Sequence, residues 1–154
     1  MNEIEVYLDL EFDKIHSTTG YVQGVIAFGA CCRYLGEIKT FYSLVCPKGF
    51  KKLSKQVKEI THLDNDEIKK APKFQRVSLM FFNWLDALKQ DYILYSFGPD
   101  DRRTLLEDCK RNQVMDDIYD DIENIQGVLS DSIIYKEKKL EDNLISSPSS
   151  RQDK

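Results

Sequence analysis

Apolar and polar residues alternate strictly along residues 4–13, near the start of the chain. The apolar side chains occupy every second position: Ile4, Val6, Leu8, Leu10 and Phe12. A period of two is typical of a β-strand with one buried face, because successive side chains point to opposite sides of a sheet. We therefore predict a strand over residues 4–13 whose other face is mainly acidic.

Two more strands are predicted after this one. Residues 14–20 are polar and are interpreted as a loop, whereas residues 22–35 and 38–46 are rich in β-branched, aromatic and other apolar residues. A tight turn is predicted at residues 36–37, and Pro47 ends the third strand. Such short connections predict an antiparallel meander of three strands.

The middle of the chain has helical periodicity. A short helix is predicted over residues 54–60 and a helical turn over residues 65–68, and a longer helix begins at Pro72. Apolar residues of the longer helix recur at spacings of three and four: Phe74, Val77, Met80, Phe81, Trp84, Leu85 and Leu88. They form one stripe, so we interpret Trp84 as a core residue rather than a surface for stacking bases.

The second half of the chain adds strands and helices in alternation. We predict a fourth strand over residues 92–97, a helix over residues 100–112 and a short fifth strand over residues 122–128. The order β, β, β, α, β, α, β predicts an α/β fold, in which a mixed five-stranded sheet carries helices on its faces. We expect one domain over residues 1–142 and a disordered tail over residues 143–154, which is rich in serine.

Composition narrows the class of protein. A chain of 154 residues with 42% apolar content can bury the core of a single domain. The net charge of −4 gives no global basic field, so a polyanion would be held by local patches or through metal ions. Four cysteines without a Cys-x-x-Cys pair are interpreted as small buried residues in a reducing compartment. No apolar run is long enough to span a bilayer, and we expect a cytoplasmic protein.

The acidic face of the first strand is the first candidate for chemistry. Asp9 and Glu11 are two residues apart, so they lie on the same face, one pleat from each other. Carboxylates this close repel each other unless a cation lies between them, and Mg²⁺ or Mn²⁺ is the usual partner of such oxygen ligands. The alternative is an edge strand with a solvated acidic face, and the segment alone does not decide between the two.

A third carboxylate follows the predicted fourth strand. Asp101 lies just beyond that strand, in the first turn of a predicted helix, where acidic side chains are also favoured for structural reasons. Ligand sites of open α/β sheets lie beyond the carboxyl ends of strands. If the first and fourth strands are parallel neighbours, Asp101 comes close to Asp9 and Glu11.

Four stretches in this order carry a resemblance to a known family. Residues 7–12 contain a hydrophobic-Asp-x-Glu motif, and residues 97–105 resemble a second acidic motif. Between them lie two strands of similar sequence (24–30 and 41–47) and a connector (60–63, followed by 71–72). The chain resembles DnaQ-like 3′–5′ exonucleases of the DEDD superfamily, most of all the Eri/KapD-like branch. The resemblance covers roughly residues 5–126 and implies an RNase H-like fold.

The resemblance implies a role for each acidic residue. Asp9 and Glu11 would hold one divalent ion, and Asp9 and Asp101 a second, with Mg²⁺ or Mn²⁺ as the expected cofactor. Asp101 is preferred to Asp100 because it lies three residues after Gly98, the family's spacing. The substrate would be the 3′ end of a single-stranded RNA or DNA.

The resemblance also implies residues that touch this substrate. The connector residues Thr61, His62 and Leu63 would contact the 3′ end. Phe12 and Leu63 are candidates to stack on the terminal bases. Ordinary packing inside the protein is the alternative for both.

One family motif is missing from its expected place. The third motif is His-x-x-x-x-Asp, in which the histidine activates the attacking water and the aspartate is a fourth ligand. His16 and His62 are the two histidines, and both come too early. We predict a helix over residues 133–144 and expect the chain to end before the helix that carries this motif. Four acidic residues could supply a substitute ligand, and the sequence does not choose among them: Asp131, Glu137, Glu141 and Asp142.

Two functions remain open on this basis. The first is a metal-dependent 3′–5′ exonuclease, favoured by the retained Asp9, Glu11 and Asp101. The second is a catalytically impaired relative that binds nucleic acid or a protein, favoured by the missing third motif. A fragment produced by a premature stop would show the same pattern.

Overall fold

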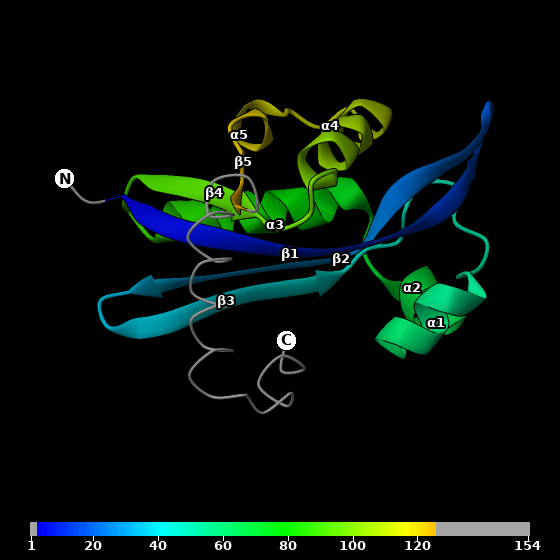
Figure 1. Ribbon diagram of the computed structural model, residues 1–154, viewed down its shortest axis with the longest axis horizontal. Helices are drawn as coiled ribbons and strands as arrows, with labels where there is room; N and C mark the ends of the chain where they lie inside the picture. The colour runs from blue at the N-terminus through cyan, green and yellow to red at the C-terminus, as the bar shows by residue number, and fades with distance from the viewer. Residues whose placement is uncertain (1–2, 126–154) are drawn as a thin grey trace, which may run out of the picture.

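A mixed five-stranded sheet forms the centre of the protein in the computed structural model, which describes residues 3–125 (Figure 1). The strand order is β3-β2-β1-β4-β5, so β1 lies in the middle. The strands are β1 (Ile4–Ser17), β2 (Gly20–Tyr34), β3 (Glu37–Leu44), β4 (Tyr92–Ser96) and β5 (Glu123–Asn124). Strand β2 is antiparallel to both of its neighbours, β1 and β3, and β1, β4 and β5 are parallel. The predicted α/β architecture with a mixed five-stranded sheet is confirmed.

Helices cover one face of this sheet and one of its ends. They are α1 (Lys55–Thr61), α2 (Asn65–Lys70), α3 (Phe74–Ala87), α4 (Asp101–Asn112) and α5 (Asp117–Asp120). Figure 1 shows α1 and α2 together beyond the end of β3, away from α3, α4 and α5. The three later helices share one hydrophobic core with the sheet. None of the helices in residues 3–125 is long and apolar enough to cross a membrane.

The main core lies between the sheet and the three later helices. The apolar residues of β1 from Ile4 to Leu10 are buried, and the intervening residues are not. Phe28 of β2 packs on Phe81 of α3 with 4.8 Å between ring centroids, and Tyr119 of α5 lies against both rings. Burial of aromatic rings of this size stabilises a fold by about 2 kcal/mol each. Trp84 packs on Phe81, which confirms its interpretation as a core residue.

A bulge in β2 lies beside the acidic pair. Glu11 pairs with Ala27 and Phe12 with Val25, so Ile26 has no partner on β1. The Ile26 side chain is fully buried in a second, smaller cluster beneath α1 and α2. An extra residue in one strand bends the sheet and increases its twist. The buried face of β1 changes at the bulge. Up to Leu10 the even-numbered residues are buried, whereas beyond the bulge the odd-numbered residues Asp13 and Ile15 are buried.

The hairpin between β1 and β2 is longer than predicted. Residues 14–20 are not a loop, because β1 continues to Ser17 and pairs with β2 up to Gly20. In Figure 1 this hairpin projects beyond the rest of the sheet. Burial of Ile15 and ladder hydrogen bonds compensate for the polar composition of the segment.

The turn between β2 and β3 lies one residue earlier than predicted. Tyr34 pairs with Glu37, so the two turn residues are Leu35 and Gly36 rather than residues 36–37. Both have positive φ angles, 53° and 79°, as a two-residue hairpin turn requires.

The cysteines were expected to be buried. Cys31 departs from this expectation, since it is exposed while the three other cysteines are buried.

Predicted helix and strand ends differ from the observed ones by a few residues. The long helix begins at Phe74, two residues after Pro72, and α5 was not predicted. Of the predicted fifth strand, residues 123–124 form β5, and residues 126–128 lie outside the described residues. The predicted helix over residues 133–144 and the predicted tail over residues 143–154 also lie outside them.

Candidate active site

The acidic pair lies on β1, on the sheet face opposite the main core. Asp9 and Glu11 are both exposed, and the adjacent residues Leu8 and Leu10 are buried beneath them. Alternation along a strand therefore places both carboxylates on one face, as the sequence predicts. The strand as a whole is central, which differs from the alternative of an edge strand, but its pairing with β4 ends at Leu8, so Asp9 and Glu11 lie where β1 pairs with β2 alone.

Asp101 reaches the same region from the first turn of α4. Its Oδ2 accepts a hydrogen bond of 3.1 Å from the amide of Gly98. A side chain at position 98 would collide with the Asp101 carboxylate, so the absence of a Cβ at Gly98 permits this close approach. Asp100 points elsewhere, since its exposed carboxylate lies 3.2 Å from the guanidinium of Arg103. The parallel pairing of β1 and β4 brings the start of α4 to this end of β1.

The three carboxylates repel one another. Partial loss of solvent around the exposed Glu11 side chain raises its pKa above the usual value, and the negative charges of Asp9 and Asp101 raise it further. Burial likewise raises the pKa of Asp101, where the charge of Asp9 adds to the shift and the Gly98 amide opposes it. No lysine or arginine of residues 3–125 forms an ion pair with any of the three. This uncompensated acidic site is suited to a cation.

The donor set fits a hard divalent ion, but the three carboxylates do not enclose one as they stand. Carboxylate oxygens are the ligands that Mg²⁺ and Mn²⁺ prefer. Among residues 3–125, no three His, Cys, Asp or Glu side chains are grouped closely enough to hold a metal ion. The Asp101 carboxylate is turned toward the Gly98 amide. The hydrogen bond engages Oδ2 only, and Oδ1 has no partner among residues 3–125, so Asp101 can offer Oδ1 to a metal ion while Gly98 orients the carboxylate.

Tyr42 is a neighbour of the acidic pair that the sequence analysis did not single out. Asp9 pairs with Gly29 of β2, and Gly29 pairs with Tyr42 of β3, so the three residues form one row across the sheet. The Tyr42 ring lies 3.5 Å from where a Cβ on Gly29 would be. Burial raises the pKa of Tyr42, and the charges of Glu11 and Asp9 contribute. Correct placement of the turn between β2 and β3 would have predicted that Tyr42 lies beside Asp9, because that turn sets which residues of the two strands pair.

The four residues expected to touch a substrate have structural roles as well. Phe12 is half-buried against the main core, and Leu63 packs against the smaller cluster. The Thr61 hydroxyl donates to the Val57 carbonyl at 2.7 Å, and His62 is the exposed αL cap of α1. Among the described residues, none of the four forms a hydrogen bond with the acidic trio of Asp9, Glu11 and Asp101. Their contact with substrate stays a prediction.

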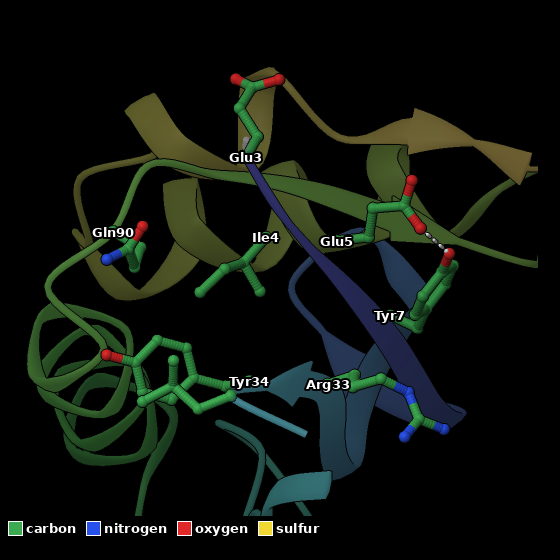
Figure 2. Close-up of a pocket in the computed structure, with 8 residues that line it drawn as sticks. Glu3, Ile4, Glu5, Tyr7, Arg33, Tyr34 and Gln90 are labelled. Carbon is green, nitrogen blue, oxygen red and sulfur yellow. Dashed lines mark hydrogen bonds between the residues drawn. The ribbon is translucent and has the colours of Figure 1, made fainter. Parts of the chain in front are cut away.

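A hollow of about 600 Å³ lies at the opposite end of β1 and includes none of the acidic trio. Two carboxylates line it, Glu3 and Glu5, and Glu5 accepts a hydrogen bond of 2.6 Å from the Tyr7 hydroxyl (Figure 2). This hydrogen bond is the main reason that the pKa of Tyr7 is raised to about 12. The hollow lacks a group of unpaired carboxylates, so we do not place the chemistry there.

Comparison with a protein-family model decides the family. The model described as exonuclease, RNase_T, matches residues 6–142. The chain belongs to the RNase_T exonuclease family. The match spans both acidic motifs and confirms the resemblance to DnaQ-like DEDD exonucleases. The finer placement in the Eri/KapD-like branch stays a prediction. A search of curated proteins finds no match.

Solved structures with the same fold include other exonucleases. Cell-death related nuclease 4 (CRN-4) superposes with a TM-score of 0.74 at 19% identity, covering 87% of this chain and 49% of that one. The nuclease domain of 3′hExo, a DEDDh family member bound to rAMP, gives 0.60 at 20% identity, covering 73% and 62%. A 3′-exonuclease described for recognition of the histone mRNA stem-loop gives 0.61 at 18% identity, covering 75% and 56%. This RNase_T-family chain therefore spans about half to three-fifths of those chains and shares their RNase H-like fold.

The place of the family's third motif is not described by the structure. The four acidic residues considered as substitute ligands lie outside the described residues: Asp131, Glu137, Glu141 and Asp142. Both histidines of this RNase_T-family chain lie in the described part, His16 on β1 and His62 at the end of α1. Neither is positioned on a helix after β5, where the motif is expected.

Proposed function

We propose that this chain is a metal-dependent 3′–5′ exonuclease that acts on single-stranded RNA or DNA. The observation that carries the proposal is the convergence of Asp9, Glu11 and Asp101, from two elements far apart in sequence, without a neutralising cation among residues 3–125. Buried or crowded like charges reduce stability, so their presence favours a functional role. Membership of an exonuclease family gives the reaction class.

Each acidic residue has a stated role in this proposal. Asp9 and Glu11, fixed by the central strand, would hold one Mg²⁺ or Mn²⁺ ion, and Asp9 and Asp101 would hold the other. Bound divalent ions activate water and stabilise the oxygen that leaves in phosphodiester hydrolysis. The chain itself orients these ligands through β1 and through the first turn of α4. Phe12, Thr61, His62 and Leu63 would position the 3′-terminal nucleotide.

The general base of the family has no counterpart in the described part of the chain. A general base contributes typically about 10²–10⁴-fold to a rate. We therefore expect slow turnover, unless a residue beyond position 125 supplies the base. Tyr42 is close to the acidic pair, but burial and the neighbouring acids raise its pKa, so it is a poor base at neutral pH.

The decisive experiment measures release of nucleotides from the full chain. A 20-nucleotide single-stranded RNA and its DNA counterpart, each labelled at the 5′ end, are incubated with Mg²⁺, with Mn²⁺ or with EDTA. Stepwise shortening from the 3′ end that requires metal supports the proposal. The Asp9→Asn variant should lose activity, because the amide is neutral and a weaker metal ligand.

Asp100→Asn is the matched control for Asp101→Asn. The two positions are adjacent and undergo the same chemical change, but the Asp100 carboxylate pairs with Arg103 and points away from the trio. Loss of activity in Asp101→Asn alone supports the assigned ligand set. Equal activity of wild type, Asp9→Asn and Asp101→Asn would contradict it. Metal-independent binding without shortening would instead favour a nucleic-acid-binding relative without catalysis.

A further inference from the structure

A basic hollow lies at the far end of the β1–β2 hairpin. Its volume is about 600 Å³, and it is enclosed by the hairpin and by the segment of residues 51–54 that follows β3. Three lysines and two rings line it: Lys14, Lys51, Lys52, His16 and Tyr21. It is distinct from the acidic trio, and the function proposed above does not use it.

The hollow is held in place by the buried carboxylate of Asp13. Asp13 Oδ2 accepts a hydrogen bond of 2.7 Å from the Ser54 amide, and Oδ1 accepts one of 2.8 Å from the Lys14 amide. Ile15 and Leu53, each 3% exposed, form an apolar floor between the two segments. A satisfied buried carboxylate and a packed floor fix the backbone that carries the lysines.

The lysines of the hollow, Lys14, Lys51 and Lys52, have no ion-pair partner in the described part of the chain. The nearby carboxylate of Asp13 is buried and already accepts two amide hydrogen bonds. In a chain of net charge −4, three unpaired lysines around one hollow form a local site for an anion.

An aromatic surface adjoins these cations. The ring centroids of His16 and Tyr21 lie 4.6 Å apart, and Tyr21 is 67% exposed. Cations together with exposed rings are the combination that binds single-stranded nucleic acid, because the cations contact phosphates and the rings stack on bases. An exposed pair of rings on a projecting hairpin has no evident role in the core.

The hollow lies farther along the strand that carries the acidic pair. Lys14 is three residues beyond Glu11 on the same strand, which corresponds to about 10 Å at the rise of a β-strand. Its side chain belongs to the other face of β1, but Ile15, in the floor of the hollow, is on the face of Asp9 and Glu11. A strand whose 3′-terminal nucleotide sits at the acidic trio can continue only in its 5′ direction. The projecting hairpin carries a basic surface within reach of that continuation.

We propose that this basic hollow binds phosphates of the substrate strand on the 5′ side of the nucleotide being removed. Lys14, Lys51 and Lys52 neutralise the backbone, and His16 with Tyr21 stacks on a base. The inference rests on the proposed exonuclease function and adds a length preference to it. Strands long enough to reach the hollow bind and react better than dinucleotides.

The first test measures binding without hydrolysis. A 5′-fluorescein-labelled ten-nucleotide RNA is titrated with the full chain in EDTA, and fluorescence anisotropy gives Kd at several salt concentrations. The variant Lys51→Ala/Lys52→Ala should weaken binding about tenfold and reduce the salt slope by about 1.4, since each phosphate contact on a single strand contributes roughly 0.7. The variant Lys39→Ala/Lys110→Ala removes the same charge elsewhere and is the matched control. Equal weakening in both variants, or none in either, would overturn the proposal.

The second test separates this inference from the proposed reaction. With Mn²⁺ present, kcat/KM is measured on a dinucleotide and on the ten-nucleotide strand. Lys51→Ala/Lys52→Ala should lower the value for the longer strand about tenfold and leave the dinucleotide unchanged. If wild type hydrolyses both equally well, the hollow has no role and the inference fails alone. If the lysine-dependent binding is present but neither substrate is hydrolysed, the exonuclease proposal fails, and the hollow remains a nucleic-acid site.

Discussion

The carboxylate of Asp108 on α4 accepts a hydrogen bond of 2.8 Å from the amide of Val25 at the bulge of β2. Its other oxygen accepts one of 2.7 Å from Arg111, whose guanidinium also donates to the Gln23 carbonyl. Asp108 is only 2% exposed, and burial raises its pKa although both hydrogen bonds oppose the shift. One buried side chain therefore ties α4, which carries Asp101, to the strand beside Glu11.

Replacing Asp108 with alanine should destabilise the protein by about 3 kcal/mol. The change leaves the Val25 amide without its partner and removes the counter-charge of Arg111, and unpaired buried groups of this kind are costly. Urea unfolding followed by circular dichroism measures the effect. Glu107→Ala, one residue away and exposed, should change the free energy of unfolding by less than about 0.5 kcal/mol. Similar values for the two variants would show that the bulge does not depend on Asp108.

Replacing Glu11 with glutamine should stabilise the metal-free protein at neutral pH. Partial loss of solvent and the charges of Asp9 and Asp101 raise the pKa of Glu11, so the folded state binds that proton more tightly than the unfolded state does. The favourable contribution is present below the ordinary pKa of 4.5 and is lost as the pH rises through the folded value. Glu11→Gln should therefore raise Tm at pH 7, by the equivalent of roughly 0.5 kcal/mol, and have little effect near pH 4.

The same pair of proteins tests metal binding. A ligand that binds the folded state alone raises Tm with its concentration. Adding Mn²⁺ to the metal-free proteins should raise the Tm of wild type and raise that of Glu11→Gln much less. An equal rise in both proteins would show that Glu11 is not a ligand.

A methyl group at Gly98 should displace Asp101. A Cβ at position 98 would collide with the Asp101 carboxylate, whereas the backbone of Gly98 does not have a positive φ that would itself exclude alanine. Gly98→Ala should therefore weaken Mn²⁺ binding and reduce exonuclease activity at least tenfold without unfolding the protein. Isothermal titration with Mn²⁺ and the shortening assay measure the two effects. Pro99→Ala is the neighbouring control, and unchanged metal binding in Gly98→Ala would contradict the role of this close approach.

The turn between β2 and β3 offers a stabilising substitution. Leu35 has a φ of 53° and is 84% exposed. Its backbone is therefore in the left-handed region, which is unfavourable for leucine, and its side chain gains no packing in return. Asparagine adopts this conformation more readily, and the pair Asn-Gly is preferred in such two-residue turns. Leu35→Asn should raise the free energy of unfolding by about 0.5–1 kcal/mol. Leu79→Asn is the control, because it makes the same substitution at an exposed position of helix α3. It should not stabilise the protein.

The sequence predicts the elements whose pattern is local. The alternation of Ile4 to Leu10 specifies a strand with one buried face, and the stripe on α3 specifies a helix. The order of the elements allows parallel pairing of β1 and β4, which was the condition for the approach of Asp101 to Asp9 and which the structure shows. These features need no knowledge of register.

The remaining features depend on contacts between distant segments. The extension of β1 to Ser17 is not visible in its polar sequence, because pairing with β2 and burial of Ile15 stabilise it. The bulge at Ile26 leaves no trace in β2, where buried residues are continuous and period two is absent. The position of Tyr42 requires a register that a one-residue error in the turn shifts to the other face. Asp101 could be chosen by spacing, but its hydrogen bond to Gly98 could not.

The pairing of Leu8 with Ser96 also orders the events of folding. The hairpins of β1, β2 and β3 close over short separations, whereas β1 and β4 meet only after a loop of more than 80 residues is closed. Closing such a loop costs conformational entropy before any contact across it forms, so local pairs form first. We expect Asp9 and Glu11 to be fixed early, on a hairpin, and Asp101 to join them late. The chain thus postpones the repulsion between Asp101 and the acidic pair until the hairpins of the sheet have formed.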